Sequence, residues 1–285
     1  MESHGTEIRR KALALLQGGM GNAEVARRLN VPRGTIGYWL HTERAGRGDL
    51  PGRPSRPCPR CDGRELDEAA YAYLLGLYLG DGHIIRYSGH RVPNLMISCS
   101  DDWPGLTDAC EAAMRAVFPG NSVCRVRRTG CRNVKVYSQH LACLFPQHGP
   151  GKKHERRIAL EPWQRKITEE HPWELVRGLL HSDGCRITNW TVRLVGGERK
   201  RYEYPRYFFA NKSRDILCLY TEALDRVGVE WRMTRRRTGV YDVSVARRAS
   251  VALMDAHRTE AMTRSTEGHE GRGVEGGPVT VGARR

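Results

Sequence analysis

Residues 74–82 read LLGLYLGDG, and residues 176–184 repeat the pattern as VRGLLHSDG. Both stretches are largely apolar and carry two small residues one helical turn apart, at Gly76, Gly80, Gly178 and Ser182. Small residues at this spacing let two helix backbones approach closely, without side chains between them. The repeat therefore predicts two helices that pack directly against each other.

An Asp-Gly pair closes each stretch and places a carboxylate at the tip of each predicted helix. The two carboxylates belong to Asp81 and Asp183, and the glycine after each permits a sharp exit into a strand. Two helices packed side by side bring these carboxylates next to each other. Adjacent carboxylates repel unless a divalent cation lies between or beside them. The repeat therefore predicts a divalent metal site at these two residues.

The sequence downstream of each Asp-Gly pair also repeats. The pattern E-A-x-x-R at 111–115 recurs at 222–226, and RRTG at 127–130 recurs at 236–239. Each half reads as helix, two strands, helix, two strands, helix, and the second half has a longer first hairpin around 196–201. The strands are expected near 84–88, 92–99, 122–128, 132–137, 185–195, 204–211, 229–237 and 240–246.

Two copies of a helix ending in Gly-x-x-x-(Gly/Ser)-Asp-Gly, each opening an αββαββα unit, resemble a single-chain LAGLIDADG (DOD-type) homing endonuclease. The resemblance covers residues 67–258. It implies an α+β fold in which the motif helices form a pseudo-dimer interface and two curved sheets form a saddle over double-stranded DNA. It also implies a monomer, because both halves lie in one chain.

The resemblance assigns catalysis and metal binding to Asp81 and Asp183, the last acidic residue of each motif. With Mg²⁺ or Mn²⁺ at these residues, it implies hydrolysis of one phosphodiester bond in each strand at a specific site. The sequence departs from the family pattern at Leu79 and His181, where aspartate is frequent, and at Arg177, where an apolar residue is usual. These positions lie on the helices, so the departures affect packing more than chemistry.

A regulator that only binds DNA is the alternative function. Sporulation regulators of the WhiA type resemble this chain, since they join a catalytically inactive LAGLIDADG body to a helix-turn-helix, with the modules in the reverse order. A body that only binds has no need of two aspartates, and both are present, which favours catalysis. Protein splicing is a third alternative, but the two ends lack the nucleophile and the His-Asn pair that it requires. A free-standing protein is therefore expected.

Residues 1–43 predict a small all-α helix-turn-helix head. An amphipathic helix from Thr6 is followed by a second helix with Asn22 as its N-cap and, after a turn at 30–32, by a short helix at 34–40. The expected apolar anchors are Val31, Ile36 and Leu40. In such a unit the second helix of the pair enters the major groove, although a helical hairpin for protein contact is the alternative. The candidate DNA contacts in the head are Arg27, Arg28, Arg33, Thr35 and Tyr38.

The charge balance indicates a polyanionic partner. The chain has 47 Lys+Arg against 32 Asp+Glu, a formal net charge of +15, and such a surplus attracts nucleic acid or anionic membranes. No apolar run is long enough for a bilayer and the start is not signal-like, so DNA in the cytoplasm (nucleoid-associated) is expected. A GC-rich coding sequence is the alternative source of arginine. The candidate contacts in the repeats are Arg125, Arg127, Arg128, Arg132, Lys135, Arg232, Arg235, Arg236 and Arg237.

Residues 44–66 are rich in Gly, Pro and Arg and predict an extended basic linker. Within it, Cys58-Pro59-Arg60-Cys61 is half of a tetrahedral Zn²⁺ site. No second C-x-x-C or H-x₃-H follows at a normal distance, so the sequence supplies only a zinc half-site. The nine cysteines are odd in number and are expected to be reduced thiols.

The remaining boundaries follow from the two repeats. Repeat 1 is expected at 67–147, an inter-repeat linker at 148–171 and repeat 2 at 172–258. The basic segment 151–157 within the linker is either solvated or contacts phosphate. The glycine- and charge-rich stretch 259–285 predicts a disordered tail.

Overall fold

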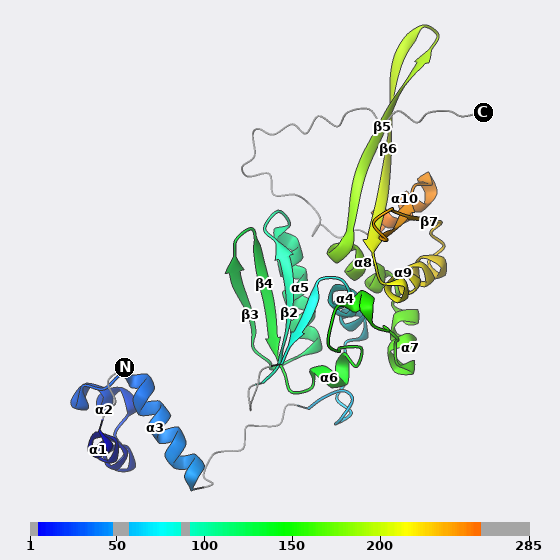
Figure 1. The fold of residues 1–285 in the computed structure, drawn as a ribbon. Helices are drawn as coiled ribbons and strands as arrows, with labels where there is room; N and C mark the ends of the chain where they lie inside the picture. Colours follow the sequence, from blue (N-terminus) through cyan, green and yellow to red (C-terminus); the bar gives the residue numbers. More distant parts are fainter. Residues whose placement is uncertain (1–4, 48–56, 87–91, 258–285) are drawn as a thin grey trace. The chain divides into compact units, whose positions relative to one another are not determined.

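The computed structural model describes residues 5–47, 57–86 and 92–257 (Figure 1). The tail predicted at 259–285 and most of the predicted linker before residue 57 lie outside the described residues. The chain divides into two compact units, Met1–Arg56 and Pro57–Arg285.

The N-terminal unit consists of three helices. They are α1 (Thr6–Gln17), α2 (Asn22–Leu29) and α3 (Arg33–Gly46). A compact core holds them together, and its buried members are Ala12, Val25, Val31, Ile36 and Trp39. Asn30, at the end of α2, adopts a left-handed conformation (φ 50°). This single residue makes the sharp turn that lets α3 fold back against α2.

Three details of this unit correct the sequence predictions. Asn22 is the first residue of α2 rather than its N-cap, which is Gly21, and no side chain caps the helix. Trp39 fills the core position predicted for Leu40, which is only half-buried. Helix α3 extends to Gly46, into the range predicted as a linker. Polar contacts along its last turns, such as the Thr42 Oγ1 bond to the Trp39 carbonyl (2.9 Å), accompany this extension.

The C-terminal unit contains both repeats in the predicted order. The first comprises α4 (Glu68–Leu79), β1 (Gly82–Ile85), β2 (Asn94–Ser100), α5 (Pro104–Val117), β3 (Val123–Arg128), β4 (Cys131–Tyr137) and α6 (Leu141–Leu144). The second comprises α8 (Pro172–Asp183), β5 (Gly184–Val195), β6 (Glu198–Asn211), α9 (Arg214–Arg226), β7 (Arg232–Arg235), β8 (Tyr241–Val245) and α10 (Arg248–Ala256). A 3₁₀ turn, η1 (Lys153–Glu155), and α7 (Pro162–Glu170) connect them. None of the helices in the described part of the chain has the length and hydropathy needed to cross a lipid bilayer.

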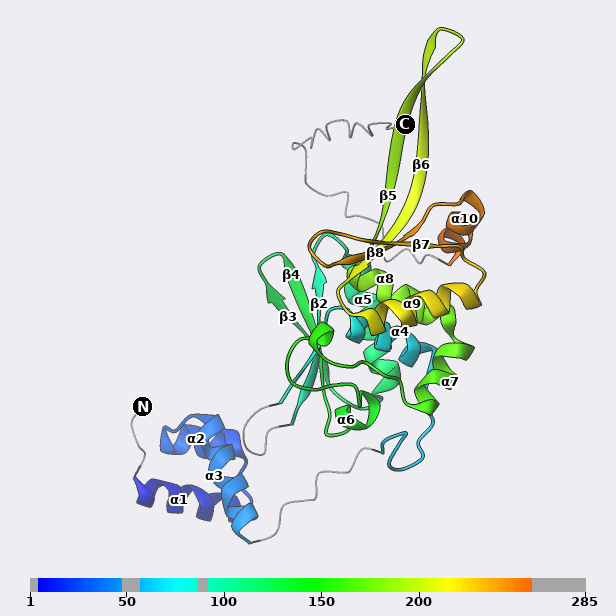
Figure 2. The same ribbon diagram turned by 45° about the vertical axis from the view of Figure 1, so that its right-hand side comes forward.

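The two sheets have the same topology, which confirms an α+β fold built from two αββαββα repeats. Their strand orders are β1-β2-β4-β3 and β5-β6-β8-β7, and every neighbouring pair is antiparallel. Helices α4 and α8 lie side by side in the middle of the unit (Figures 1 and 2). The repeat seen in the sequence is therefore a structural repeat.

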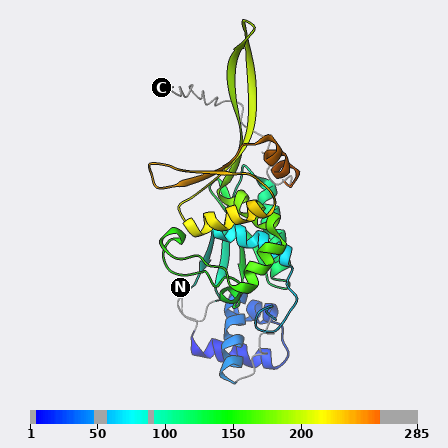
Figure 3. The same cartoon turned by 90° about the vertical axis from the view of Figure 1, so that its right-hand side faces the viewer.

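The long hairpin β5–β6 differs from its prediction. Strand β6 begins at Glu198 rather than 204, because the turn consists only of Gly196 and Gly197. Both glycines have positive φ, 62° and 85°, a conformation that matches the twist of a tight hairpin. Figures 1 and 3 show this hairpin extending clear of the helices of its unit.

Strand β7 is shorter than predicted, because the apolar residue at its start belongs to the end of α9. Gly228 adopts a left-handed conformation (φ 72°), and the Val229 amide bonds back to the Leu224 carbonyl at 2.9 Å. This is a Schellman-type helix ending. It buries Val229 against the core, so this apolar residue marks the end of a helix and not the start of a strand.

Each sheet has a helix-covered face and an opposite face. In the first sheet the side chains of Leu95, Ile97, Val134 and Val136 are buried in the core beneath the helices. Successive residues of a strand point to opposite sides, so the register places the intervening residues on the opposite face, which we call the open face. Its exposed and half-buried members in the first sheet include His83, Met96, Ser98, Arg128 and Lys135.

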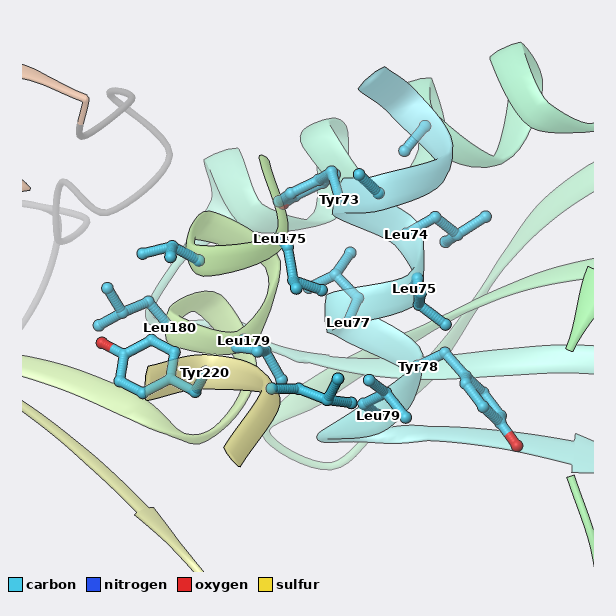
Figure 4. Packing of buried hydrophobic residues seen from close by; sticks show 14 of the residues in the cluster. Tyr73, Leu74, Leu75, Leu77, Tyr78, Leu79, Leu175, Leu179, Leu180 and Tyr220 are labelled. Carbon is cyan, nitrogen blue, oxygen red and sulfur yellow. The ribbon is translucent and has the colours of Figure 1, made fainter. Parts of the chain in front are cut away.

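The contact between α4 and α8 depends on glycine. A Cβ atom on Gly76 would lie 2.8 Å from the Leu175 carbonyl oxygen, and one on Gly178 would collide with the Tyr73 carbonyl oxygen. The leucines that flank the contact, including Leu77 and Leu179, fill the space on either side (Figure 4). The two helix backbones thus touch directly, as the small-residue spacing predicts.

The glycines after the two aspartates are also required, but for a reason other than a left-handed turn. Gly184 is extended (φ −105°, ψ 164°), and Gly82 is not among the residues with positive φ. A Cβ atom would meet the Tyr78 carbonyl oxygen at 2.9 Å from Gly82, and the Leu180 carbonyl oxygen at 2.7 Å from Gly184. Each strand therefore leaves its helix so closely that only glycine fits.

We expect Gly178→Ala to destabilise the C-terminal unit by at least about 2 kcal/mol, because the added methyl meets backbone atoms that cannot move aside. Chemical denaturation followed by tryptophan fluorescence measures this. The control is Gly34→Ala in α3, where the same methyl has no neighbour within 4 Å. Equal stability of Gly178→Ala and the wild type would contradict the direct backbone contact.

Candidate active site

Asp81 and Asp183 lie at the adjacent tips of the two motif helices. Asp183 is the last residue of α8, and Asp81 follows α4 directly after the C-cap Gly80. A Cβ atom on Gly80 would lie 3.2 Å from Asp183 Oδ2, so this carboxylate rests on the α4 backbone one residue before Asp81. The structure thus brings together the two side chains that the motifs single out.

The pKa values of both carboxyl groups are raised at this site, so each is harder to ionise than in water. The pKa of Asp81 is raised to about 6, first by its loss of solvation and then by the charge of Asp183, with Lys153 acting in the opposite direction. Burial also raises the pKa of Asp183, whereas Lys153 and a hydrogen bond from Asn211 lower it. Two negative charges held at one place favour a cation beside them.

Lys153 supplies positive charge from the connection between the repeats. Its Nζ donates to the carbonyl oxygens of Gly80 (2.6 Å) and Gly82 (2.7 Å) and lies 5.2 Å from the Tyr78 ring centre. Carbonyls at the C-terminal end of a helix carry its negative dipole, so an ammonium group is stabilised there. Burial lowers the pKa of Lys153 to about 8, and the charges of Asp183 and Asp81 oppose that change.

The sequence did not single out Lys153. The segment 151–157 was expected to be either solvated or in contact with phosphate, yet its lysine caps α4 beside the aspartates. The only signal was a Lys-Lys pair shortly before the second motif. The path of a connection without a helical or strand pattern cannot be derived from such a pair.

Asn211 fixes the orientation of the second aspartate. Its Nδ2 donates to Asp183 Oδ2 at 2.8 Å, while its Oδ1 accepts the Ser213 amide at 2.8 Å. Both ends of the amide are therefore engaged, and Asp183 is held at one of its two oxygens. Among the described residues no hydrogen bond reaches the other oxygen of Asp183, which leaves it for a further ligand.

Each aspartate lines a cleft of its own, and each cleft combines both repeats. The cleft of Asp81 is lined by Ser98 and Ser100 from β2 and by Ser182, Gly184, Cys185 and Arg186 from the second repeat. The cleft of Asp183 is lined by Gly80 and Lys153 and by Ala210, Asn211 and Lys212 of the second repeat. The centre therefore presents two related openings with one carboxylate in each.

The donor atoms at this centre suit a hard divalent cation. Carboxylate oxygens are the ligands that Mg²⁺, Mn²⁺ and Ca²⁺ prefer. Burial, and then the charge of Asp183, raise the pKa of Asp81 despite the nearby Lys153, and a bound cation would favour the ionised pair. These residues therefore fit the predicted metal, and Asp81 and Asp183 are the side chains that would hold it.

The predicted basic residues of the first sheet fall on two different faces. Arg128 and Lys135 lie on the open face, whereas the register puts Arg125, Arg127 and Arg132 on the helix-covered side. Arg125 is paired with Asp108 (2.7 Å) and with Glu111 of α5, and Arg132 with Asp101 (3.4 Å). The register therefore separates these three residues from Arg128 and Lys135, and their contact with DNA stays a prediction. An arginine-rich hairpin does not reveal which residues point which way until the pairing register is known.

The second sheet divides its arginines in the same way. Arg232 lies on the open face, while Arg235 points to the other side and lies 5.6 Å from the Tyr241 ring centre. Arg236 is held by both carboxylate oxygens of Asp242, and Arg237 is exposed. The open face also carries Arg206, which the sequence analysis missed.

The departures from the motif pattern lie inside the helix contact. His181 is buried, and its Nδ1 lies 2.8 Å from the Tyr73 hydroxyl. The Arg177 guanidinium lies 4.4 Å from the Tyr73 ring centre and pairs with Glu174. Leu79 is buried in the core. All three act in packing and none reaches the carboxylate pair as a ligand.

The remaining candidates lie outside this centre. In the N-terminal unit, Arg27, Arg28, Arg33 and Tyr38 are exposed and Thr35 is half-buried. Tyr38 is 65% exposed, which is unusual for a large aromatic side chain without a partner surface. Cys58 and Cys61 lie in the segment that leads into α4, beside α6.

Solved structures similar to this chain include LAGLIDADG proteins. Mesophilic variants of the homing endonuclease I-DmoI match with a TM-score of 0.46 and 17% identity, covering 67% of this chain and 90% of theirs. I-DmoI in complex with DNA and Mn matches with a TM-score of 0.45 and 16% identity, covering 66% of this chain and 95% of that chain. The N-terminal LAGLIDADG domain of DUF199/WhiA matches with a TM-score of 0.42 and 11% identity, covering 67% of this chain and 80% of that chain. Neither family models nor curated protein sequences gave a match.

We expect opposite shifts of the Asp81 pKa in two variants of the metal-free protein. Asp183→Asn removes the repelling charge and should lower the pKa from about 6, whereas Lys153→Met removes an attracting charge and should raise it. Carboxyl carbon chemical shifts followed by NMR over pH 3–9 measure both. Shifts in the same direction would contradict the charge arrangement described here.

The same raised pKa has a consequence for stability. A carboxyl group whose pKa is higher in the folded state stabilises the fold at low pH, and this contribution disappears as the pH rises through about 6. A bound cation reverses this dependence, because it favours the ionised carboxylate.

Proposed function

We propose that this protein is a DNA endonuclease of the LAGLIDADG homing type, which hydrolyses both strands of a specific duplex site with Mg²⁺ or Mn²⁺. The observation that carries the proposal is the pair of aspartates at the tips of two directly packed helices. They lie between two topologically equal halves, each in its own cleft. Two related clefts match a duplex, whose two strands are themselves related by a local twofold axis.

The residues of the centre divide the chemistry among them. Asp81 and Asp183 would hold the cation, which when bound polarises a phosphate oxygen and lowers the pKa of an attacking water. Asn211 keeps Asp183 in one orientation. Lys153 offsets the negative charge of the pair in the free protein. With DNA bound, its ammonium group is placed to donate to a phosphate oxygen and to stabilise the charge that develops there.

The open faces of the two sheets are the proposed DNA surface of the body. Arg128, Lys135, Arg206 and Arg232 share these faces, so they are the residues placed to contact phosphates. The β5–β6 hairpin extends the surface, since Arg193 and Lys200 pair across it on the same side as Arg206. Phosphate contacts position the protein, and polar side chains such as Ser98 then read base edges.

The three-helix head is the second proposed DNA contact. Helix α3 presents Arg33 and Tyr38 to solvent, while Arg27 and Arg28 end the preceding helix. This arrangement supports a helix-turn-helix, in which α3 would enter the major groove and the arginines of α2 would approach the backbone. Tethering a weakly binding head to the body raises its effective concentration at the target.

We expect cleavage in Mg²⁺ to depend on both aspartates. A bound duplex is first obtained by selection from a random pool and then incubated with wild type, Asp81→Asn or Asp183→Asn. Each substitution should slow cleavage at least about 100-fold or restrict it to one strand, because charge stabilisation at the reacting phosphate is worth several kcal/mol. Strand-specific labels on a sequencing gel measure this.

The control for the cleavage test is Asp102→Asn, an exposed aspartate in the turn after β2 that should leave the rate unchanged. Cleavage by all three variants would contradict the site. Tight binding by the wild type without cutting in Mg²⁺ or Mn²⁺ would instead make the protein a binding-only regulator.

We expect the two faces of one hairpin to differ in DNA binding. The double variant Arg128→Ala/Lys135→Ala removes two open-face charges and should weaken binding about tenfold or more. It should also reduce the salt slope by about 2, close to one unit per phosphate contact. The matched control Arg127→Ala/Arg132→Ala removes the same charge from the opposite face of the β3–β4 hairpin. Equal losses in both would show that binding follows net charge rather than the open face.

A further inference from the structure

Four metal-ligating side chains from two distant segments meet beside the first repeat. They are Cys58, Cys61, His140 and Cys143, whose ligand atoms all lie within 4.8 Å of one another. Cys58 is buried, His140 and Cys143 are partly shielded, and Cys61 is at the surface. The cluster lies apart from the aspartates, and the proposed nuclease chemistry makes no use of it.

The first pair comes from a tight turn that leads toward α4. The Asp62 amide bonds to the Cys58 carbonyl at 2.9 Å, and the Cys58 amide bonds to Asp62 Oδ2 at 2.7 Å. Gly63 completes the turn in the left-handed region (φ 66°). A C-x-x-C turn of this kind directs both sulfur atoms toward one point.

The second pair comes from the first turn of α6. His140 is the N-cap of this helix, and Cys143 lies three residues later, a spacing that puts two side chains on one helix face. The Cys143 amide bonds to the His140 carbonyl at 3.2 Å, and the His140 amide is anchored on Ser138 Oγ at 3.1 Å. Both pairs are therefore held in place by hydrogen bonds with residues close to them in the sequence.

The distances between the ligand atoms suit a tetrahedral metal. Cys61 Sγ lies 3.4 Å from Cys143 Sγ and 3.7 Å from His140 Nδ1, and Cys143 Sγ lies 3.9 Å from the same nitrogen. Zinc bonds of about 2.3 Å to sulfur and about 2.0 Å to nitrogen put tetrahedral ligands roughly 3.5–3.8 Å apart. Three sulfurs and one imidazole favour Zn²⁺ over the hard cations expected at the aspartates.

We propose that Cys58, Cys61, His140 and Cys143 form a structural zinc site. The set supplies four ligands and leaves no position for a substrate, which distinguishes a structural site from a catalytic one. It completes the half-site that the sequence contained. The other half was missed because it lies 79 and 82 residues beyond Cys61 and is an H-x-x-C rather than a second C-x-x-C.

The site joins the two ends of the first repeat. The turn at Cys58 leads into α4, and α6 is the last helix of the repeat. The segment between the turn and α4 has no helix or strand, and its anchors include Arg64, which donates to the Val117 carbonyl at 2.7 Å. Zinc would fix this segment, and thereby the entry of α4, whose other end carries the catalytic centre.

Metal analysis of the full chain tests the site without DNA. After purification and dialysis against a mild chelator, we expect about one zinc per chain in the wild type and in Cys218→Ser, an exposed thiol on α9. Cys143→Ser should retain at least about tenfold less zinc per chain than the wild type. A zinc-free wild type, or the same zinc loss in Cys218→Ser, would overturn the site, as would a Cys61–Cys143 disulfide in the freshly isolated protein.

Cobalt substitution tests the site in the wild type alone, should Cys143→Ser fold poorly. Zinc-depleted wild-type protein refilled with Co²⁺ should show thiolate-to-cobalt charge transfer and the ligand-field bands of tetrahedral Co²⁺. Octahedral bands without charge transfer would overturn the proposal. We also expect a strong chelator to lower the melting temperature of the wild type and to leave that of Cys143→Ser unchanged. None of these readouts depends on nuclease activity.

Discussion

The direct backbone contact between α4 and α8 is the constraint on which the rest of the C-terminal unit depends. At Gly76 and Gly178 the helices approach so closely that a single methyl group has no room. This spacing sets the separation of the two helix tips and thereby the separation of the two carboxylates. It also places one sheet beside each helix, because β1 and β5 leave the tips through glycines that fit only at close range. The packing of the two helices therefore also fixes the geometry of the carboxylate pair.

That geometry creates an electrostatic cost, which the protein offsets only in part. Burial at the helix tips, and then the charge of the neighbouring Asp183, raise the pKa of Asp81 to about 6. Lys153, which donates to the carbonyls of Gly80 and Gly82, reduces the repulsion, but burial lowers its own pKa. A carboxylate pair that is both desolvated and self-repelling favours a bound cation, and the charge on Asp81 changes with pH near 6.

The sequence predicted the features that repeat and missed those that depend on the third dimension. The motif helices, their aspartates and the order of strands followed from two similar stretches and their spacing. Which side of β3 Arg125 faces depends on register, and an arginine-rich string carries no periodicity that reveals it. Lys153 and the pair His140 and Cys143 became visible only when segments distant in sequence met. Trp39 replaced Leu40 in the small core because helix phase near a short turn is uncertain by one residue.

The position of Lys153 also breaks the symmetry of the centre. The repeats supply one aspartate each, but a single connection joins them, and its lysine lines the cleft of Asp183 and not that of Asp81. The cleft of Asp81 has Arg186 among its walls instead, but the Nε and Nη2 of this arginine donate to the Asp255 carboxylate, at 2.8 and 3.0 Å. If the two clefts act on opposite strands, they do so with different basic side chains beside the carboxylate. The duplex would then pass through a nicked intermediate, with one strand cut before the other. The connection between the repeats, rather than either repeat, would set this order.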